Sequence, residues 1–243
     1  MQMSSAVLWK EWKVFANRFV STTLGAIIGP LLYLVAFGWG LGDSVTAQGQ
    51  SYTAFVIPGI VALNAMTVSY SWVANDINLA RIYAKTFEAV MVAPVRMWTY
   101  SISRIATSAL RGLYSSSLIL LLAAIMRVHL SLSWYFWLVL VLNCLVFATI
   151  GFIAGLKIDS HADMAKVSNF VITPMSFLCG TFFPLSKLPA LLRWLFELLP
   201  LTQAVKGMRT GLADPAALIV IAVLAAWLVV LLPLSIYICN RSE

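Results

Sequence analysis

The sequence predicts an all-α integral membrane protein with six transmembrane helices. Of its 243 residues, 61% are hydrophobic and only 10% are charged, whereas about a quarter of the residues in a soluble domain are charged. So few polar side chains could not cover the core of a soluble protein of this length. The apolar residues are also gathered in long uncharged runs, and the charged residues lie between those runs. Together these observations exclude a soluble globular protein.

Six uncharged runs give the six predicted spans. A helix needs about 20 mostly apolar residues to cross about 30 Å of hydrocarbon. The third run is shorter than this because Arg111 and Arg127 bound it. We expect that helix to begin near Ser101, with the charged ends of Arg104 and Arg111 extending toward the interface. The predicted spans of a single transmembrane domain, residues 1–243, cover residues 20–42, 54–75, 101–126, 134–156, 167–183 and 216–239.

Ahead of the first span, residues 4–19 form a predicted amphipathic helix. Apolar side chains recur at helical spacing along one side, and basic side chains lie mostly on the other. The apolar residues are Leu8, Trp9, Trp12, Phe15 and Phe19. A ragged extension of the first span is the alternative, but it would carry charges into hydrocarbon. We therefore expect an interfacial helix in the inner headgroup layer.

The loop between the second and third spans contains a further predicted helix. Good helix formers run from Leu79 to Val92 without Gly or Pro, and Pro94 stops the helix. Lys85 and Glu88 are three residues apart on its surface. Its apolar contacts would come from Ile82, Phe87, Val90 and Met91. An ordered loop of this length is usually functional, although a solvated basic face would explain the charges equally well.

Between the fifth and sixth spans, residues 184–211 are apolar but interrupted. The interrupting prolines are Pro184, Pro189 and Pro200. Arg193 and Glu197 are four residues apart on one helical face, where they can pair. Apolar segments of about 10 to 14 residues are typical of interfacial or re-entrant helices. We expect two short helices that dip back into the outer leaflet and are covered by protein or face water.

The basic residues predict the orientation of the chain, because loops rich in Lys and Arg stay in the cytoplasm. With both termini inside, the cytoplasmic residues are Lys10, Lys13, Arg18, Arg81, Lys85, Arg96, Arg104, Arg111, Lys157, Lys166 and Arg241. The external residues are Arg127, Lys187, Arg193, Lys206 and Arg209. Both termini are therefore predicted to be cytoplasmic. The net charge of +7 is then explained by the membrane surface, so a nucleic-acid partner is not predicted.

The sequence contains no motif for catalysis, for cofactor binding or for a metal site. It lacks the GxxxxGK[ST] phosphate loop, HExxH and GxSxG. Cys144, Cys179 and Cys239 lie far apart in apolar runs, which favours buried apolar roles over a disulfide or a metal cage. All nine acidic residues fall outside the uncharged runs, so no buried carboxylate relay is predicted. Uphill transport by this chain would therefore need energy from another protein.

Two further patterns concern packing and a possible path. Glycine pairs four residues apart allow close helix contacts, either within a subunit or at a dimer interface. These pairs are Gly25 and Gly29, Gly151 and Gly155, and Gly207 and Gly211. Aromatic residues near span ends are normally interface anchors, but at mid-depth they could line a path for a sugar or an aromatic substrate. The candidate path residues are Tyr33, Phe37, Asn64, Tyr70 and Phe177.

The chain resembles the permease subunits of ABC-2-type exporters, in particular the nodulation-factor (lipo-oligosaccharide) and drug-export permeases. The resemblance covers nearly the whole chain and includes the amphipathic N-terminal helix. Three blocks carry it: KTFEAVMVAPVRMW after the second span, ITPMSFLCGTFFPLSKLP at the end of the fifth, and LLPLTQAVKGMR before the sixth. The last two blocks together are the most specific.

The resemblance implies a homodimer of six-span subunits in the lipid of the bacterial cytoplasmic (inner) membrane. Two copies of a separate ABC ATPase would bind ATP and Mg²⁺, and this chain would bind no cofactor and would not be an enzyme. Glu88 and Pro94 match the family's Glu and Pro in the loop whose coupling helix docks into the ATPase. The predicted coupling residues within residues 79–94 are Arg81, Lys85, Phe87, Glu88, Val92 and Pro94.

The resemblance also implies a path between two subunits, lined mainly by spans 1, 2 and 5. The family's Phe-Pro…Leu-Pro signature gives an outer lid whose residues are Phe183, Pro184, Leu188 and Pro189. The substrate would be amphipathic: a lipid-linked oligosaccharide or polysaccharide, a lipid or a drug. A membrane-embedded enzyme and a non-transport scaffold remain alternatives. An importer permease is a weaker alternative, because EAVMVAP shares only its first two residues with the importers' Glu-Ala-Ala…Gly loop.

Overall fold

In the residues that the computed structural model describes, the regular elements are helices apart from one short hairpin, which confirms the predicted all-α fold. The structure describes residues 13, 23, 28–29, 31–33, 46–47, 50–92, 96–126, 128, 132–185, 189–210 and 214–241. The strands β1 (Thr46–Ala47) and β2 (Gln50–Ser51) pair antiparallel. The long helices are α3 (Tyr52–Ile82), α5 (Met97–Ile125), α6 (Trp134–Lys157) and α11 (Ala217–Asn240). The shorter ones are α4 (Thr86–Val92), α7 (His161–Val167), the π-helix η2 (Ser168–Ile172), α8 (Thr173–Leu178), α9 (Ala190–Glu197) and α10 (Pro200–Arg209).

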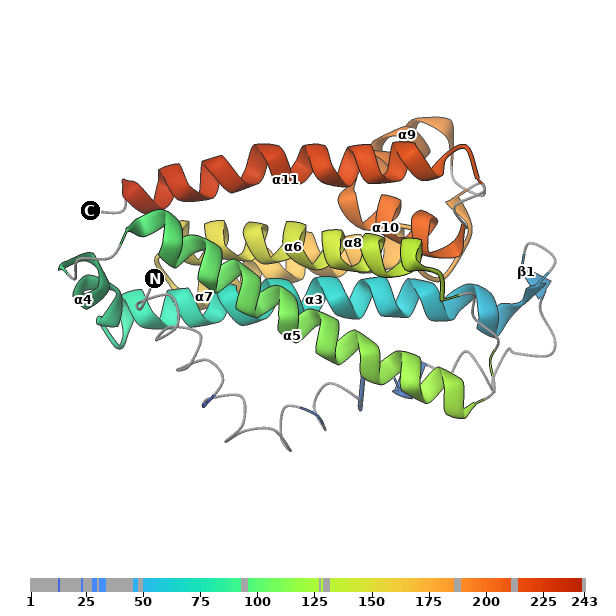
Figure 1. Ribbon diagram of the computed structural model, residues 1–243, viewed down its shortest axis with the longest axis horizontal. Coiled ribbons are helices and arrows are strands. Elements are labelled where there is room, and N and C mark those ends of the chain that lie inside the picture. Colours follow the sequence, from blue (N-terminus) through green and yellow to red (C-terminus); the bar gives the residue numbers. More distant parts are fainter. Residues whose placement is uncertain are drawn as a thin grey trace.

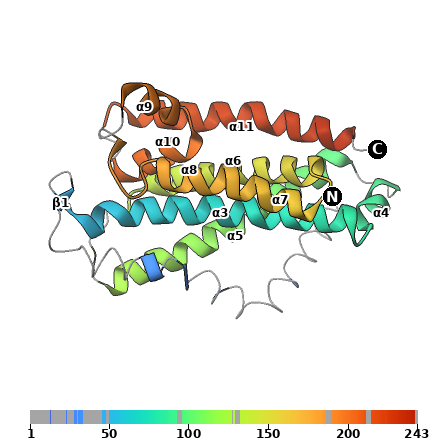
Figure 2. The ribbon, with the colours of Figure 1, turned by 180° about the vertical axis from the view of Figure 1, so that it is seen from behind.

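The helices run lengthwise in a bundle with two distinct ends (Figure 1). One end carries α4, and the C-terminal end of α11 lies at the same end. The other carries β1, α9 and α10, and the view from behind agrees (Figure 2). We refer to these as the α4 end and the α10 end. The chain therefore returns to the α4 end after its last long helix.

The central helix of the bundle is α3, which contacts α4, α5, α6, α7 and α10. Its apolar residues are not confined to one side, as expected for a helix enclosed by other helices. Within the described part of the chain, four helices are long and apolar enough to cross a membrane: α3, α5, α6 and α11. Most of the predicted first span, residues 20–42, lies outside the described residues.

The predicted fifth span corresponds to α7, η2 and α8, which follow one another without a break. The residues at both junctions keep right-handed helical backbone angles. The N–H of Thr173 bonds to the carbonyl of Ser168, five residues back, and Pro174 has no N–H to continue an α-helical ladder. The extra residue of the π-turn accommodates this interruption. The helix begins at His161 and ends at Leu178, so it starts and ends earlier than the predicted 167–183.

Glycines allow α6 to lie directly on the backbone of α3. A Cβ on Gly151 would collide with the Tyr70 carbonyl, and one on Gly155 would lie 2.9 Å from the Ala74 carbonyl oxygen. These two glycines therefore pack within the subunit. At Gly29, in contrast, an added Cβ would meet no atom within 4 Å.

Buried polar side chains also join the long helices. Asn64 on α3 donates to Ser115 on α5 (2.7 Å), and Asn143 on α6 donates to the Ala62 carbonyl (3.0 Å). Ser108 on α5 donates to a further carbonyl of α3, at a distance of 2.7 Å. Such interhelical hydrogen bonds stabilise bundles in which lipid provides no hydrophobic drive for association.

The prediction that Arg104 and Arg111 extend toward the interface is wrong. Their exposed fractions are only 7% and 6%, because both side chains are buried between α3 and α5. Arg104 forms an ion pair with Asp76, and the Arg111 guanidinium lies over the Trp72 ring. Partners on α3 therefore retain both charges inside the bundle.

Candidate functional site

The predicted coupling region is divided into two elements at the α4 end. Instead of one helix from Leu79 to Val92, α3 continues to Ile82 and α4 begins at Thr86. Between them Lys85 has a φ of 48°, a left-handed conformation that non-glycine residues seldom adopt. This turn redirects the chain, so α4 is separate from α3.

The side chains of α4 face in two directions. Phe87 is buried, with its ring centroid 6.1 Å from that of Tyr100 on α5. Lys85 and Glu88 are exposed, and Val92 has an exposed fraction of 88%. Phe87 therefore anchors α4 to the bundle, while the other three form an exposed surface. The predicted coupling residue Pro94 lies outside the described residues.

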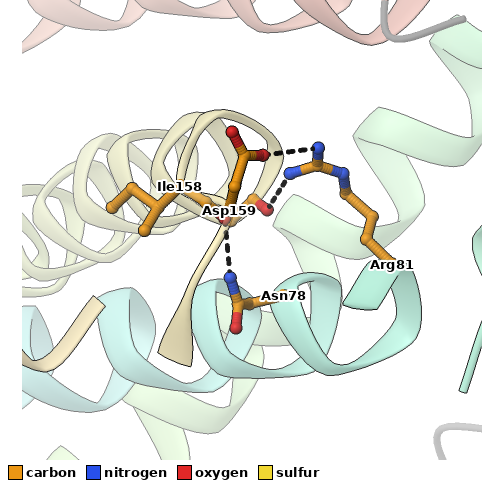
Figure 3. A network of polar contacts seen from close by, with 5 residues as sticks. Asn78, Arg81, Ile158 and Asp159 are labelled. Carbon is orange, nitrogen blue, oxygen red and sulfur yellow. Dashed lines mark hydrogen bonds and ion pairs between the residues drawn. The ribbon is translucent and has the colours of Figure 1, made fainter. Parts of the chain in front are cut away.

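The Arg81 side chain is directed toward Asp159 and the C-terminal end of α6 (Figure 3). Its guanidinium donates to the Gly155 carbonyl (3.2 Å) and forms an ion pair with Asp159 (3.1 Å). One turn earlier, Asn78 donates to the Ile158 carbonyl at 2.8 Å. The last carbonyls of a helix lack intrahelical partners and carry partial negative charge, which a cation complements. These contacts fasten the end of α3 to the end of α6.

At the α10 end, residues 180–185 form a turn after α8, which we call the α8 turn. It begins at Gly180, whose φ of +81° is a conformation suited to glycine at a helix C-terminus. The predicted lid residues Phe183 and Pro184 are half-buried in it, and Pro189 is exposed immediately before α9. The fourth lid residue, Leu188, lies outside the described residues. On α9, Arg193 and Glu197 form the expected pair at 3.1 Å.

The sequence analysis missed the main contact of the α8 turn, which is made by Arg209 of α10. The guanidinium donates to the carbonyls of Gly180 and Thr181, both at 2.7 Å, and to that of Phe55 at 3.0 Å. In the sequence this residue is one of the basic residues predicted to be external and the last residue of LLPLTQAVKGMR. Its partners are backbone atoms, which every residue type carries, so spacing alone could not reveal them.

The structure separates the candidate path residues into two groups. Asn64 is buried against α5, and Tyr70 is buried with its hydroxyl 3.9 Å from the sulfur of Met164. Neither side chain lies at a surface of the described part of the chain. The candidate Phe37 lies outside the described residues.

The remaining two candidates gather at the α8 turn. The ring of Phe182 lies 5.4 Å from that of Tyr33 and 5.6 Å from that of Phe177, measured between centroids. Phe177 is 46% exposed. The turn thus packs on Tyr33 of the same chain, and its aromatic cluster reaches the surface. Among the described residues, no three His, Cys, Asp or Glu side chains gather where they could hold a metal ion.

Comparison with known proteins agrees with the resemblance drawn from the sequence. A family model described as ABC-2 type transporter matches residues 4–213. The inner membrane transport permease YadH of Escherichia coli K12 is 30% identical over 210 residues, which cover 84% of this chain and 80% of the relative. Nodulation protein J of Rhizobium meliloti is 31% identical over 201 residues, covering 82% and 75%. Nodulation protein J of Sinorhizobium fredii is 28% identical over 212 residues, covering 86% and 80%.

These matches and the apolar helices indicate a multi-pass protein of the inner membrane. The named permease relatives are consistent with a transport subunit that is not itself an enzyme, and ABC-2 permeases in general work with an ABC ATPase. The chain belongs to the ABC-2 type transporter family, as the membrane subunit of an ABC transporter.

Proposed function

We propose that this chain is the permease subunit of an ATP-driven exporter. Two copies form the membrane domain, and two copies of a separate ATPase bind ATP and Mg²⁺ and dock at the α4 end. The substrate is an amphipathic molecule: a lipid-linked oligosaccharide or polysaccharide, a lipid or a drug. It leaves the cytoplasm or the inner leaflet by alternating access between the two subunits.

The observation that carries this proposal is the geometry of α4. The helix is anchored by the buried ring of Phe87 and presents Glu88 and Val92 to the surrounding space. An apolar side chain bordered by charged ones resembles the apolar core and polar rim of a protein interface. The contacts of Arg81 with Gly155 and Asp159 provide a route from this surface into α6.

The proposed topology has six spans with both termini in the cytoplasm. The first span lies within residues 20–42, and the fifth is α7, η2 and α8. The helices α9 and α10 are re-entrant in the outer leaflet. The basic residues of the α4 end support this orientation by the positive-inside rule; they include Lys85, Arg96, Lys157, Lys166 and Arg241.

Single-cysteine labelling tests the orientation. In a protein with Cys144, Cys179 and Cys239 replaced by Ala, the exposed residues Lys85 and Lys206 are changed to Cys one at a time. An impermeant maleimide added to intact cells should label position 206 and leave position 85 unlabelled. Labelling of position 85 from outside would refute the proposed topology.

Reconstitution tests the function. The permease and its ATPase are inserted into liposomes with the ATPase outside, and ATP-dependent accumulation of fluorescent amphiphiles in the lumen is measured. One member of the panel should stimulate hydrolysis and be accumulated. Glu88→Ala should reduce accumulation, whereas Lys166→Gln, which changes an exposed cation at the same end, should not. Outward movement from the lumen, or hydrolysis unaffected by the permease, would contradict an exporter.

A further inference from the structure

Arg209 is a half-buried cation whose hydrogen-bond partners are backbone carbonyls from two separate segments. Nη1 and Nη2 donate to Gly180 and Thr181 in the α8 turn, and Nε donates to Phe55 at the start of α3. The guanidinium carbon also lies 3.6 Å from the centroid of the Phe55 ring. Among the described residues, no carboxylate forms an ion pair with it. The side chain therefore joins α10, α3 and the α8 turn through its fork of donors.

The α8 turn is bound by side chains at three consecutive carbonyls. Arg209 accounts for the first two, and the hydroxyl of Tyr52 on α3 donates to the third, that of Phe182, at 2.9 Å. Carbonyls that follow a helix lack intrahelical partners and carry partial negative charge. A planar guanidinium supplies five donors in a fixed geometry, which a lysine ammonium cannot reproduce.

Gly59 supports the same contact from α3. A Cβ at this position would lie 2.6 Å from the Thr181 carbonyl oxygen and 3.0 Å from Nη2 of Arg209. A side chain here would push the turn away from α3, because contacts this short are repulsive. Gly59 and Arg209 are far apart in sequence, and both favour the same arrangement, in which the α8 turn lies flat on the start of α3.

We propose that Arg209 is a positioning residue that holds the α8 turn closed over the outer end of the transport path. Its hydrogen bonds seat Phe182 between Tyr33 and Phe177, and the turn opens only when they are broken. This inference rests on the proposed function, in which the turn is the outer lid. Gly59 and Tyr52 assist by allowing the close approach and by binding the third carbonyl.

A labelling experiment without the ATPase tests the inference directly. Leu185→Cys is introduced into the permease with its native cysteines replaced by Ala, and the rate of reaction with an impermeant maleimide is measured in membranes. Arg209→Lys and Arg209→Gln should each raise this rate by at least about tenfold, the effect of losing one charge-assisted hydrogen bond. Arg193→Lys is the matched control, since it changes an exposed arginine at the same end, and it should leave the rate unchanged.

If the Arg209 variants do not accumulate as folded protein, Tyr52→Phe can test the inference in their place. It removes only one hydroxyl and should raise the rate by a smaller factor, as should Gly59→Ala, which leaves the cation in place. Thermal unfolding midpoints equal to that of the parent would show that the variants are folded. Parental labelling rates in folded Gly59→Ala and Tyr52→Phe would overturn the inference.

The complete transporter gives an independent measurement. Arg209→Lys should retain ATP hydrolysis but move less substrate per ATP, because the lid no longer closes between cycles. Absence of export by the unaltered complex would refute the proposed function, and the labelling rates would still decide the role of Arg209.

Discussion

The guanidinium of Arg111 stacks over the indole ring of Trp72, with 3.5 Å between the guanidinium carbon and the ring centroid. The pair joins α5 to α3 inside a bundle that is otherwise largely apolar. A charged side chain at membrane depth is costly. A desolvated contact with an aromatic face offsets part of that cost, by about 2 kcal/mol.

Replacement of the ring should therefore destabilise the protein. Trp72→Leu should lower the free energy of unfolding by about 2 kcal/mol, because it removes the cation–π contact and part of the buried surface. Trp72→Phe keeps a ring and should cost less. The measurement is unfolding of the detergent-purified permease, with the exposed Trp134→Leu as the control. Equal losses for Trp72→Leu and Trp134→Leu would show that the stacking is unimportant.

Adjacent residues of α4 should have different effects when changed. Phe87→Ala should destabilise the attachment of α4 by about 3–5 kcal/mol, as for other buried rings, and should accelerate amide hydrogen exchange of residues 86–92. Glu88→Ala should leave that exchange unaltered and reduce ATP-driven transport by about tenfold, the effect of one important interface side chain. Normal transport by Glu88→Ala would show that this residue does not contribute to the ATPase interface.

The contacts at the end of α6 should differ in strength. Asp159 is largely exposed, so Asp159→Asn should cost less than about 1 kcal/mol. Arg81→Ala also deprives the Gly155 carbonyl of its donor and should cost about 1–3 kcal/mol. Unfolding of the purified variants measures both. A larger loss for Asp159→Asn than for Arg81→Ala would mean that the ion pair, and not the carbonyl contact, holds the two helices.

Substitution of glycine by alanine should destabilise the protein at some positions of the spans and not at others. Gly151→Ala should destabilise the bundle by about 1–3 kcal/mol, because the added methyl group would collide with the Tyr70 carbonyl. Gly29→Ala should not lower the stability of the subunit, since nothing lies within 4 Å of the added atom. Unfolding midpoints of the two variants provide the comparison. A loss of stability in Gly29→Ala but not in Gly151→Ala would show that Gly29, and not Gly151, packs closely within the subunit.

The long helices were predictable because hydrophobic runs and their boundaries are encoded locally. The helix break before α4 was not, since Lys85 adopts its left-handed conformation without a Gly or Pro to indicate it. The buried position of Phe87 depends on Tyr100, which belongs to the next helix. Local patterns therefore gave the elements but not the directions of their side chains.

Long-range partners explain the other differences. Arg104 and Arg111 carry the same charge as basic residues of the loops, and contacts with Asp76 and Trp72 on α3 help to keep them inside. Arg209 binds carbonyls, which have no sequence signature. The earlier start of the fifth helix is explained by Ser160, whose hydroxyl caps it by accepting from the Ala162 N–H.

The limited contact of α11 with the rest of the subunit affects how the sequence can change during evolution. The helix contacts α5, α6 and α10 along one stripe, whose buried residues are Ala217, Val220, Leu224, Leu231, Ser235 and Cys239. Its other faces are covered with exposed aliphatic side chains such as Leu218, Ile219, Val229 and Val230. Hydrocarbon accepts one aliphatic side chain as readily as another, so selection on those faces acts on hydrophobicity and hardly on shape. Homologues should therefore differ most on the lipid side of α11, and the stripe should retain small or closely matched residues.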